Sequence, residues 1–430
     1  MKKYLALLAA LMFVACGSSN NDISDVPVPD IPLNPPATHA KTVKPKGVWI
    51  DASANLERFA TKDNIDIYLQ RIKDTGFNQI YLDVKPGIGY ALYNSDVLPT
   101  LKTWGSTTIN GDWDYLGYWI EKATAIGIDV IPTISTLGYG DANNKQGLVY
   151  DDMKWDGKTQ MRMDGNNSDK LVDMRDEKNV DAVMLNPCIP EVQQLVLSVV
   201  GEIVTRYPKI KGICLDYCRW WSEDFGFSPA TMDAFSAYIG QNVSSRNQII
   251  TQSGNQGDLY KRWVEFRSQT ITNLVTNIRD CVKNINDSVG VYLWASADWG
   301  TRYLYGQNWA SNTYEPTANN IYTSSYGMTG FAEQLDAFIL GAYTEYVWKS
   351  ENPNSVWTVE NFVTTYNSWI KNACKTYGSI QVYNMNVSKI SDAIYLCLQH
   401  TDGLMVFELS HIINNGIWSQ IKDGIDRAEK

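Results

Sequence analysis

The sequence predicts an α/β protein with a single (β/α)8 TIM barrel over residues 46–430. Short apolar runs alternate with amphipathic segments, so that a strand pattern is followed by a helix pattern eight times. Acidic residues stand at the ends of several apolar runs, which is typical of the active-site face of such a barrel. No internal repeat of about 20–50 residues is visible, which argues against a solenoid.

The composition is that of a globular protein. The chain has 430 residues, of which 44% are apolar and 20% charged, which is ample for a large core. Its formal net charge is −10, and it has no basic run. Because such a chain matches a nucleic-acid backbone poorly, we expect no nucleic-acid partner. We also expect a monomer.

Residues 1–16 resemble a bacterial lipoprotein signal. A basic start, Met1–Lys3, precedes the apolar run Tyr4–Val14, which is too short to span a bilayer. Ala15 then places a small residue before Cys16, so we expect cleavage and lipidation at Cys16. An ordinary secretory signal is the alternative. The signal predicts a lipid anchor in the bacterial cell envelope, on the periplasmic side of the outer membrane or at the surface.

Residues 17–45 predict a tether. They are rich in Ser, Asn, Asp and Pro, so they cannot bury a core and would hold the barrel off the membrane. The remaining six cysteines are expected to be mostly free and structural, because no C-x-x-C pair exists and the chain is large. They are Cys188, Cys214, Cys218, Cys281, Cys374 and Cys397. A zinc site at Cys214 and Cys218 is a remote alternative, and we expect no metal and no cofactor.

The strand and helix patterns alternate along the chain. Thr61–Gly76 illustrates a helix, since Ile65, Leu69 and Ile72 keep helical spacing and Gly76 ends it. The expected strands are Gly47–Asp51, Gln79–Val84, Ile128–Ile134, Ile210–Leu215, Gly290–Ala295, Ala337–Tyr343, Ile380–Asn384 and Gly403–Glu408. The other expected helices are Trp113–Ala125, Glu191–Tyr207, Ser228–Gly240, Tyr260–Asn284, Val359–Tyr377, Ser391–Gln399 and Ile417–Ala428.

Long insertions interrupt this alternation. Lys85–Gly111 and Trp299–Tyr326 follow the second and fifth strands, and Leu137–Pro190 follows the third. Within the last of these, Gly147–Tyr150 and Thr159–Arg162 predict a hairpin that turns at Asp156-Gly157. Asp164–Asp169 offers oxygen ligands without EF-hand spacing, so we expect a solvated loop there.

The stretch Lys211–Trp221 is the most informative in the chain. Its apolar run ends in Asp216, and Arg219, Trp220 and Trp221 follow at once. A carboxylate at the C-terminal end of a buried strand, beside a cation and indole rings, is typical of a site. A capping role for Asp216 is the alternative. Acidic residues also end other strands: Asp51, Asp83, Asp298, Glu345 and Glu408.

These residue types favour glycoside hydrolysis. Of only three histidines, His39 lies in the tether, and the chain has no G-x-S-x-G, P-loop, dinucleotide or H-E-x-x-H motif. Glycoside hydrolysis needs two carboxyl groups, and the 15 Trp and 25 Tyr suit stacking on sugar rings. Trp49 and Trp294 are expected in the core, since they are mid-strand. Loop tryptophans are better candidates for sugar contact: Trp220, Trp221, Trp299, Trp309 and Trp348.

Asp216 is the predicted nucleophile or principal carboxylate. Glu345 is the preferred partner as general acid/base, and Asp298 and Glu408 compete for that role. Arg219 would keep Asp216 ionised. The predicted substrate-binding residues are Asp83, Lys85, Arg219, Trp220, Trp299, Tyr343 and His411. For Asp83 the alternative is a capping role or an ion pair with Lys85.

Motifs along the barrel resemble the glycosyl-hydrolase-like family ten, which is related to α-amylase-type and α-galactosidase-type hydrolases. They are Gly47–Ile50, Gly76–Lys85, Tyr93–Ser95 with Pro99, Leu185–Pro187, Pro190–Val192, Gly212–Arg219, Trp263, Gly341–Tyr343 and Phe407–Ser410. The match extends from Gly47 to about Gly424. Tyr217 stands where the family's fourth-strand signature has a second Asp, the following proline is absent, and a third-strand His-Trp motif is missing near Pro132–Gly138.

The resemblance implies a carbohydrate-directed barrel. Members of this family include envelope enzymes that act on peptidoglycan glycan strands, and lipoprotein members resemble glycan-degradation proteins. A lipid-anchored glycoside hydrolase is therefore the leading hypothesis. A non-catalytic glycan-binding surface lipoprotein and a peptidoglycan glycan-strand hydrolase are the alternatives, because a fold does not fix a function.

Overall fold

The computed structural model describes residues 43–109, 113–165, 167–178, 180, 182–251, 253–317 and 320–430. Lys44–Lys430 forms one compact unit. The predicted signal with Cys16, and residues 17–42 of the predicted tether, lie outside the described residues. Lys44, which the sequence analysis assigned to the tether, joins the barrel: its Nζ donates to the carbonyl oxygens of Leu398 (2.5 Å) and Thr401 (2.8 Å).

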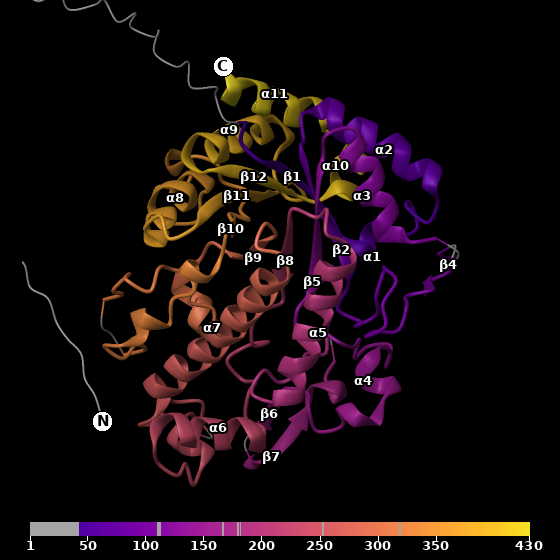
Figure 1. Cartoon of the computed structure of the whole chain (residues 1–430). Coiled ribbons are helices and arrows are strands. Elements are labelled where there is room, and N and C mark those ends of the chain that lie inside the picture. The colour runs from indigo at the N-terminus through magenta and orange to yellow at the C-terminus, as the bar shows by residue number, and fades with distance from the viewer. Residues whose placement is uncertain are drawn as a thin grey trace, which may run out of the picture. The chain divides into compact units, whose positions relative to one another are not determined.

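A closed barrel of parallel strands forms the centre of this unit, which confirms the predicted fold (Figure 1). Around the barrel the order is β1-β12-β11-β10-β9-β8-β5-β2. The strands are β1 (Lys46–Ile50), β2 (Gln79–Lys85), β5 (Asp129–Ser135), β8 (Gly212–Asp216), β9 (Gly290–Ser296), β10 (Ala337–Gly341), β11 (Lys375–Gln381) and β12 (Gly403–Phe407).

Helices surround the barrel, and Figure 1 shows α9 and α11 side by side at the outside of β11 and β12. The helices are α1 (Ala52–Asn55), α2 (Lys62–Thr75), α3 (Tyr115–Ala125), α4 (Leu148–Asp151), α5 (Pro190–Arg206), α6 (Pro229–Ile239), α7 (Tyr260–Ile285), α8 (Val359–Asn361), α9 (Ile390–His400), α10 (Leu409–Asn415) and α11 (Trp418–Glu429). No helix in the described part of the chain has the length and apolar character needed to cross a bilayer.

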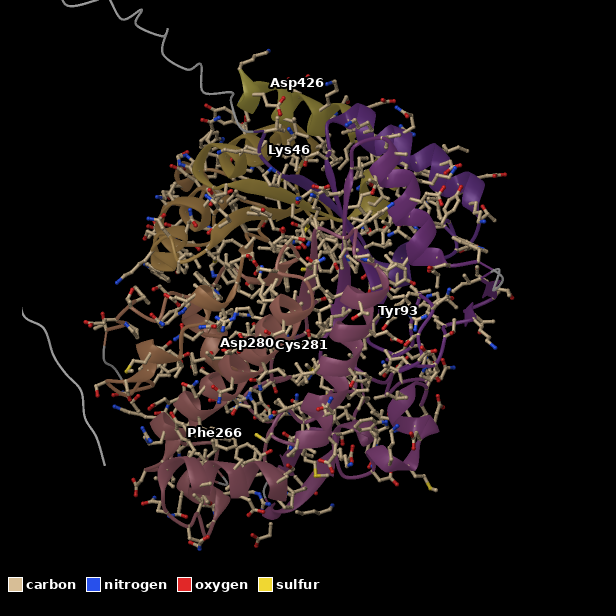
Figure 2. The ribbon with its side chains drawn as sticks, viewed as in Figure 1. Lys46, Tyr93, Phe266, Asp280, Cys281 and Asp426 are labelled. Carbon is tan, nitrogen blue, oxygen red and sulfur yellow. The ribbon has the colours of Figure 1, made fainter. Side chains whose placement is uncertain are left out.

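The helices are held to the barrel and to each other by buried apolar side chains. Figure 2 labels Cys281, which lies near the C-terminal end of α7. Its Sγ lies 3.7 Å from the carbonyl oxygen of Leu197 in α5, where the two helices pack together. The described cysteines are free thiols, as predicted. Gly76 ends α2 at φ +105°, which confirms the predicted stop of that helix.

The inside of the barrel is filled by a separate apolar layer. Every strand contributes to this layer: Trp49, Tyr81, Ile131, Cys214, Tyr292, Ala337, Ile339, Tyr377 and Met405. Trp294 and Phe407 pack against it from the strand ends. Trp49 is 3% exposed and so lies in the core as predicted. This layer closes the barrel, so any site must lie above it, at the C-terminal ends of the strands.

The structure corrects the predicted seventh unit. Helix Val359–Tyr377 is not continuous: α8 passes into a π-helix at Phe362–Tyr366 and a 3₁₀ turn at Asn367–Ile370. Lys371 and Asn372 then adopt left-handed backbone (φ 51° and 59°), which ends the helical segment. The strand therefore begins at Lys375, five residues before the predicted start at Ile380.

The predicted hairpin is also corrected. Gly147–Tyr150 leads into α4, and the hairpin is instead formed by β6 (Met161–Asp164) and β7 (Asn167–Asp173). It packs against the apolar cluster of α6 and α7 (Figure 1). A second small hairpin, β3 (Thr103–Trp104) with β4 (Thr107–Thr108), stands on the insertion after β2. Of the stretch expected as a solvated loop, Asp164 ends β6 and Asn167–Asp169 begin β7.

Candidate active site

Side-chain alternation raises three aspartates above the apolar floor of the barrel. Residues two apart on a strand point to the same side. Trp49, Tyr81 and Cys214 belong to the apolar layer inside the barrel. Asp51, Asp83 and Asp216 each lie two residues further along the chain, so their side chains also point to the inside of the barrel. The strands concerned lie along one arc of the barrel, in the order β1, β2, β5 and β8.

A cavity of about 940 Å³ opens above these residues. Asp51, Asp83 and Asp216 all line it, together with Trp49 and Tyr217. Thr133 and Ser135 of β5 line it between Asp83 and Asp216. The insertion after β2 and the loop after β5 form the far wall, with Tyr90, Pro99–Gly105, Asp141, Asn144 and Gln146. The cavity is therefore acidic at its base and polar and aromatic towards its edge.

Asp216 ends β8, as predicted, and is half-buried. Its Oδ1 accepts a hydrogen bond of 2.7 Å from the backbone N–H of Tyr217. Burial raises the pKa of Asp216 to about 6; the Tyr217 N–H and the charge of Arg219 oppose this rise, and the charge of Asp51 adds to it. This carboxyl group therefore changes its charge close to neutral pH.

Asp83 is more strongly perturbed. Burial, then the charge of Asp51 and that of Asp216, raise the pKa of Asp83 well above its usual value. Its Oδ2 accepts a weak hydrogen bond of 3.3 Å from the N–H of Ala52, and its buried Oδ1 has no hydrogen-bond partner among the described residues. A carboxyl group in this environment favours the protonated form, in which it can donate a proton.

Asp51 has a local structural role. Its Oδ1 accepts from the N–H of Ala54 (3.0 Å) and from the Ser53 hydroxyl, so it caps α1. It still contributes charge to both Asp83 and Asp216. The described residues contain no group of three or more His, Cys, Asp or Glu side chains arranged to hold a metal ion.

Glu408 is buried, and its carboxylate connects two helices through hydrogen bonds. It is 1% exposed and accepts hydrogen bonds from Asn55 Nδ2 (2.8 Å), from the N–H groups of Ser410 and His411 (both 3.1 Å), and from the Ser410 hydroxyl. These bonds cap α10 and tie it to α1. Its predicted catalytic role is not supported by this position, because each carboxylate oxygen is already occupied.

Glu345 and Asp298 lie apart from the aspartate cavity. Glu345 is exposed in the loop after β10, and Asp298 is 7% exposed after β9, where the Thr301 hydroxyl donates to its Oδ2 (2.6 Å). Neither lines the cavity. The structure therefore does not bring Asp216 together with its predicted partners; it brings Asp216 together with Asp83 and Asp51.

Lys85, Trp220 and Trp299 are buried rather than open to a ligand. The Lys85 ammonium donates to the carbonyl oxygens of Ser135 and Gly138 and lies 3.4 Å from the centre of the Tyr139 ring. Trp220 is 0% exposed and lies against Arg267, and Trp299 is 6% exposed among the rings of Tyr322 and Tyr326. Trp309 is also 0% exposed. Their positions support roles in holding the loops rather than the predicted contacts with sugar.

Other predicted binding residues do reach the strand-end face. Tyr343 is half-buried between Trp294 and Phe407, and burial together with the charge of Asp216 raises its pKa. His411 is half-buried with its ring 5.0 Å from that of the exposed Tyr383. Trp348 is half-buried, and its Nε1 donates to Asp392 (3.3 Å).

Arg219 lies in a stack of rings beside Asp216. Its guanidinium is 5.0 Å from the Tyr217 ring, 5.4 Å from the Trp221 ring and 5.0 Å from the Tyr305 ring. Two of its donors are directed at the carbonyl oxygens of Trp220 and Trp221. The charge of Arg219 lowers the pKa of Asp216, but burial outweighs it and the net pKa is raised to about 6.

Sequence reasoning missed Tyr217 and the far wall of the cavity. Tyr217 has φ +46°, a left-handed conformation that is rare for a residue with a large side chain. No turn residue marks it. Part of the far wall is Pro99–Gly105, a segment of the insertion after β2, whose position over the mouth depends on packing and not on a local pattern.

The fold and the site together define a (β/α)8 barrel with a carboxylate-lined cavity at the C-terminal ends of its strands. The chain belongs to the glycosyl hydrolase-like 10 family, whose model matches residues 44–402. This confirms the resemblance identified from the motifs.

Curated relatives match in part. An S-layer-related protein of Niallia circulans is 26% identical over 85% of this chain and 23% of its own length. The glycosyl hydrolase DigH of Escherichia coli K12 is 27% identical over 61% of this chain and 63% of its own length. The chain thus spans less than two thirds of the length of these relatives.

Solved structures share the fold at low sequence identity. An α-L-fucosidase isoenzyme 2 from Paenibacillus thiaminolyticus has a TM-score of 0.56 at 15% identity, covering 90% of this chain and 49% of its own. The catalytic domain of a β-amylase from Paenibacillus polymyxa has a TM-score of 0.54 at 15% identity, covering 90% of this chain and 99% of its own. At these identities the likeness shows a shared barrel fold.

Proposed function

We propose that this protein is a glycoside hydrolase in which Asp216 and Asp83 form the carboxylate pair. The observation that carries the proposal is that both line one cavity and that burial and the charge of Asp51 raise both pKa values, to about 6 for Asp216 and well above the usual value for Asp83. The Tyr217 N–H and Arg219 favour the ionised form of Asp216. At Asp83, burial and the charges of two neighbouring aspartates outweigh the Ala52 N–H and Lys85, and its Oδ1 has no hydrogen-bond partner among the described residues, so the protonated form is favoured. Carboxyl groups whose environments differ in this way are suited to opposite roles.

In this mechanism Asp83 donates a proton to the leaving glycosidic oxygen. Asp216, ionised, either attacks the anomeric carbon or takes a proton from an attacking water. The sugar would lie over Trp49 and against Tyr217, both of which line the cavity.

The strand positions favour the water route. Asp83 on β2 and Asp216 on β8 are separated by β5. Two spacings of about 4.8 Å between strands give roughly 9–10 Å between the two backbones, and the carboxyl groups, which point into the barrel, lie somewhat closer together. Inverting enzymes hold their carboxyl groups about 6.5–9.5 Å apart, whereas retaining enzymes hold them about 5 Å apart. We therefore propose inversion of the anomeric configuration.

Product release from a glycan panel tests the proposal. The panel contains purified peptidoglycan strands, O- and N-glycans and plant polysaccharides, each incubated with the wild type, Asp216→Asn and Asp83→Asn. We expect one class to be cleaved, with activity lost by about a hundred- to ten-thousandfold in each variant while folding is retained. NMR of the first product should show inverted configuration.

The variants also separate this proposal from the alternatives. Binding of one glycan without turnover by any of the three proteins would favour a glycan-binding protein. Full activity in Asp83→Asn with loss in Glu345→Gln would return the acid role to Glu345.

We also propose the predicted envelope location, with the barrel anchored through lipid at Cys16. It rests on the sequence of residues 1–16. Replacement of Cys16 by Ala should move the protein from the membrane fraction to the soluble fraction of the cell envelope. Retention of Cys16→Ala in the membrane fraction would contradict the anchor.

A further inference from the structure

A pair of arginines lies behind Tyr217, a residue of the cavity wall, outside the proposed catalytic pair. Arg219 follows β8, and Arg302 belongs to the 3₁₀ helix Trp299–Tyr305 that follows β9. Both guanidinium groups lie against the ring of Tyr305, with their central carbons 5.0 Å (Arg219) and 4.5 Å (Arg302) from the ring centre. The N–H of Trp220 donates to the carbonyl oxygen of Tyr305 (3.0 Å), which fixes the two loops to each other.

The pair is continuous with the cavity wall. Arg219 also lies over the ring of Tyr217, which lines the cavity directly beside Asp216. The Tyr217 and Trp221 rings are nearly parallel (13°) with their centres 6.4 Å apart. Two cations and three aromatic rings, all half-buried, therefore form one cluster that adjoins the cavity through Tyr217. Stacked rings suit a sugar face, and guanidinium forks suit a carboxylate.

Arg302 is held at this place without a carboxylate. Its Nε donates to the carbonyl oxygen of Asp298 (3.1 Å) and an Nη to the Thr301 hydroxyl (2.9 Å). Within the described residues it forms no salt bridge. Burial lowers the pKa of Arg302, and the charge of Arg219 lowers it further, against the opposing effects of Tyr305 and Asp298. An anion between the two guanidinium groups would relieve this unfavourable proximity.

We propose that the arginine pair binds the carboxylate of an acidic sugar unit next to the bond that is cleaved, so that the substrate is an anionic glycan. The three aspartates would repel such a group at the base of the cavity, so the acidic unit would lie beyond Tyr217, next to the arginine pair. This inference rests on the proposed function, because it names the substrate class of the same site.

Binding to matched oligosaccharides tests the inference. Asp216→Asn protein is titrated calorimetrically with uronate tetrasaccharides of the galacturonate, mannuronate and hyaluronate types. Each is compared with its carboxyl-reduced counterpart, which keeps the linkage and loses the charge, and with a sulfated neutral tetrasaccharide. At least one carboxylated member should bind about tenfold or more tightly than its reduced form, since a hydrogen bond to a charged group supports such a ratio. The preference should weaken as salt is added.

Arginine variants then test whether Arg302 causes the preference for the carboxylated sugar. Arg302→Gln in the Asp216→Asn background should reduce the ratio to about twofold or less, and Arg302→Lys should keep part of it through its charge alone. Arg279→Gln, on α7 outside the site and also half-exposed, is the matched control and should leave the ratio unchanged. Thermal unfolding of each variant shows whether it is folded.

The outcomes are distinct. Equal binding of carboxylated and reduced sugars, binding of none, or a preference that survives in Arg302→Gln would overturn the inference. Tighter binding of the sulfated sugar than of every uronate would replace carboxylate by sulfate and overturn it as stated. Cleavage of a neutral glycan by the wild type would leave the proposed function standing and the inference rejected. Preferential uronate binding without turnover of any glycan would support the inference and reject the proposed function.

Discussion

The backbone N–H of Tyr217 donates a hydrogen bond of 2.7 Å to Oδ1 of Asp216, the residue before it in the chain. Tyr217 directs its N–H at this carboxylate while in the left-handed region, at φ +46°. The same turn carries its ring to Arg219 and to the cavity wall. One strained residue thus connects the proposed base to the proposed sugar-binding edge, as is common at functional sites.

Substitution of Tyr217 should reveal this backbone conformation. Tyr217→Val should be less stable than Tyr217→Gly by about 1–2 kcal/mol, because a β-branched residue is disfavoured at positive φ and glycine is not. Both variants lose the ring, so their difference reports the backbone. Urea unfolding measures it. The same pair at Thr358, which has φ −138°, is the control and should reverse the order. Equal stability at Tyr217 would contradict the strain.

The raised pKa of Asp216 predicts a pH-dependent stability. Because the folded pKa, about 6, lies above that of the unfolded chain, Asp216 favours folding below about pH 4, and this contribution is lost as the pH rises through 6. Asp216→Asn lacks the effect. From pH 4 to pH 7 the wild type should therefore lose up to about 3 kcal/mol relative to the variant. Parallel stability curves for the two proteins would show that Asp216 is not perturbed.

The barrel was predictable because each strand and most helices carry their own local pattern. Ile65, Leu69 and Ile72 define α2, and Gly76 ends it at positive φ. The prediction of the seventh unit was wrong because this local pattern is missing there. Lys371 and Asn372 adopt left-handed backbone although neither is glycine, so the sequence contains no signal for the end of the helix. The π-helix at Phe362–Tyr366 likewise depends on packing.

The site was predictable only in part. Asp216 could be identified because it ends an apolar run beside Arg219 and two tryptophans. Its partner could not, because strand order and side-chain phase decide which carboxylates meet. In the sequence Glu408 ends a strand like the other acidic residues. Phe407 before it packs on the apolar layer inside the barrel, whereas the Glu408 side chain points the other way and caps α10. Trp220 and Trp299 follow strands as a sugar platform would, yet both are buried.

Glu408 should prove structural. Glu408→Ala removes the acceptor for two N–H groups of α10 and for Asn55, so we expect a loss of about 2–4 kcal/mol in the free energy of unfolding. At a temperature where the variant is folded, its kcat should remain within about tenfold of the wild type. Glu345→Gln, at an exposed residue, is the comparison and should leave stability unchanged. A stable but inactive Glu408→Ala would restore Glu408 as a catalytic candidate.

Lys85 should also act through structure. Its buried ammonium holds the carbonyl oxygens of Ser135 and Gly138, so Lys85→Met leaves both unpaired and should cost about 2–3 kcal/mol of stability. Since the side chain does not line the cavity, the KM of the folded variant should change by less than about threefold. Chemical denaturation and steady-state kinetics measure the two effects. A large rise in KM at unchanged stability would instead support the predicted contact with substrate.

Asp83 can be tested through the leaving group. A protonated carboxyl is needed only when the departing oxygen is basic, so Asp83→Asn should cut cleavage of an alkyl glycoside by about a hundredfold or more. A dinitrophenyl glycoside of the same sugar leaves without protonation, and its cleavage should be reduced by less than about tenfold. Asp216→Asn, which removes the base, should impair both substrates alike. The falling limb of the wild-type pH–rate profile should disappear in Asp83→Asn with the dinitrophenyl substrate, because burial and two neighbouring aspartates raise the pKa of Asp83 well above its usual value. Equal losses for both leaving groups in Asp83→Asn would mean that Asp83 positions the sugar and that the proton comes from another residue.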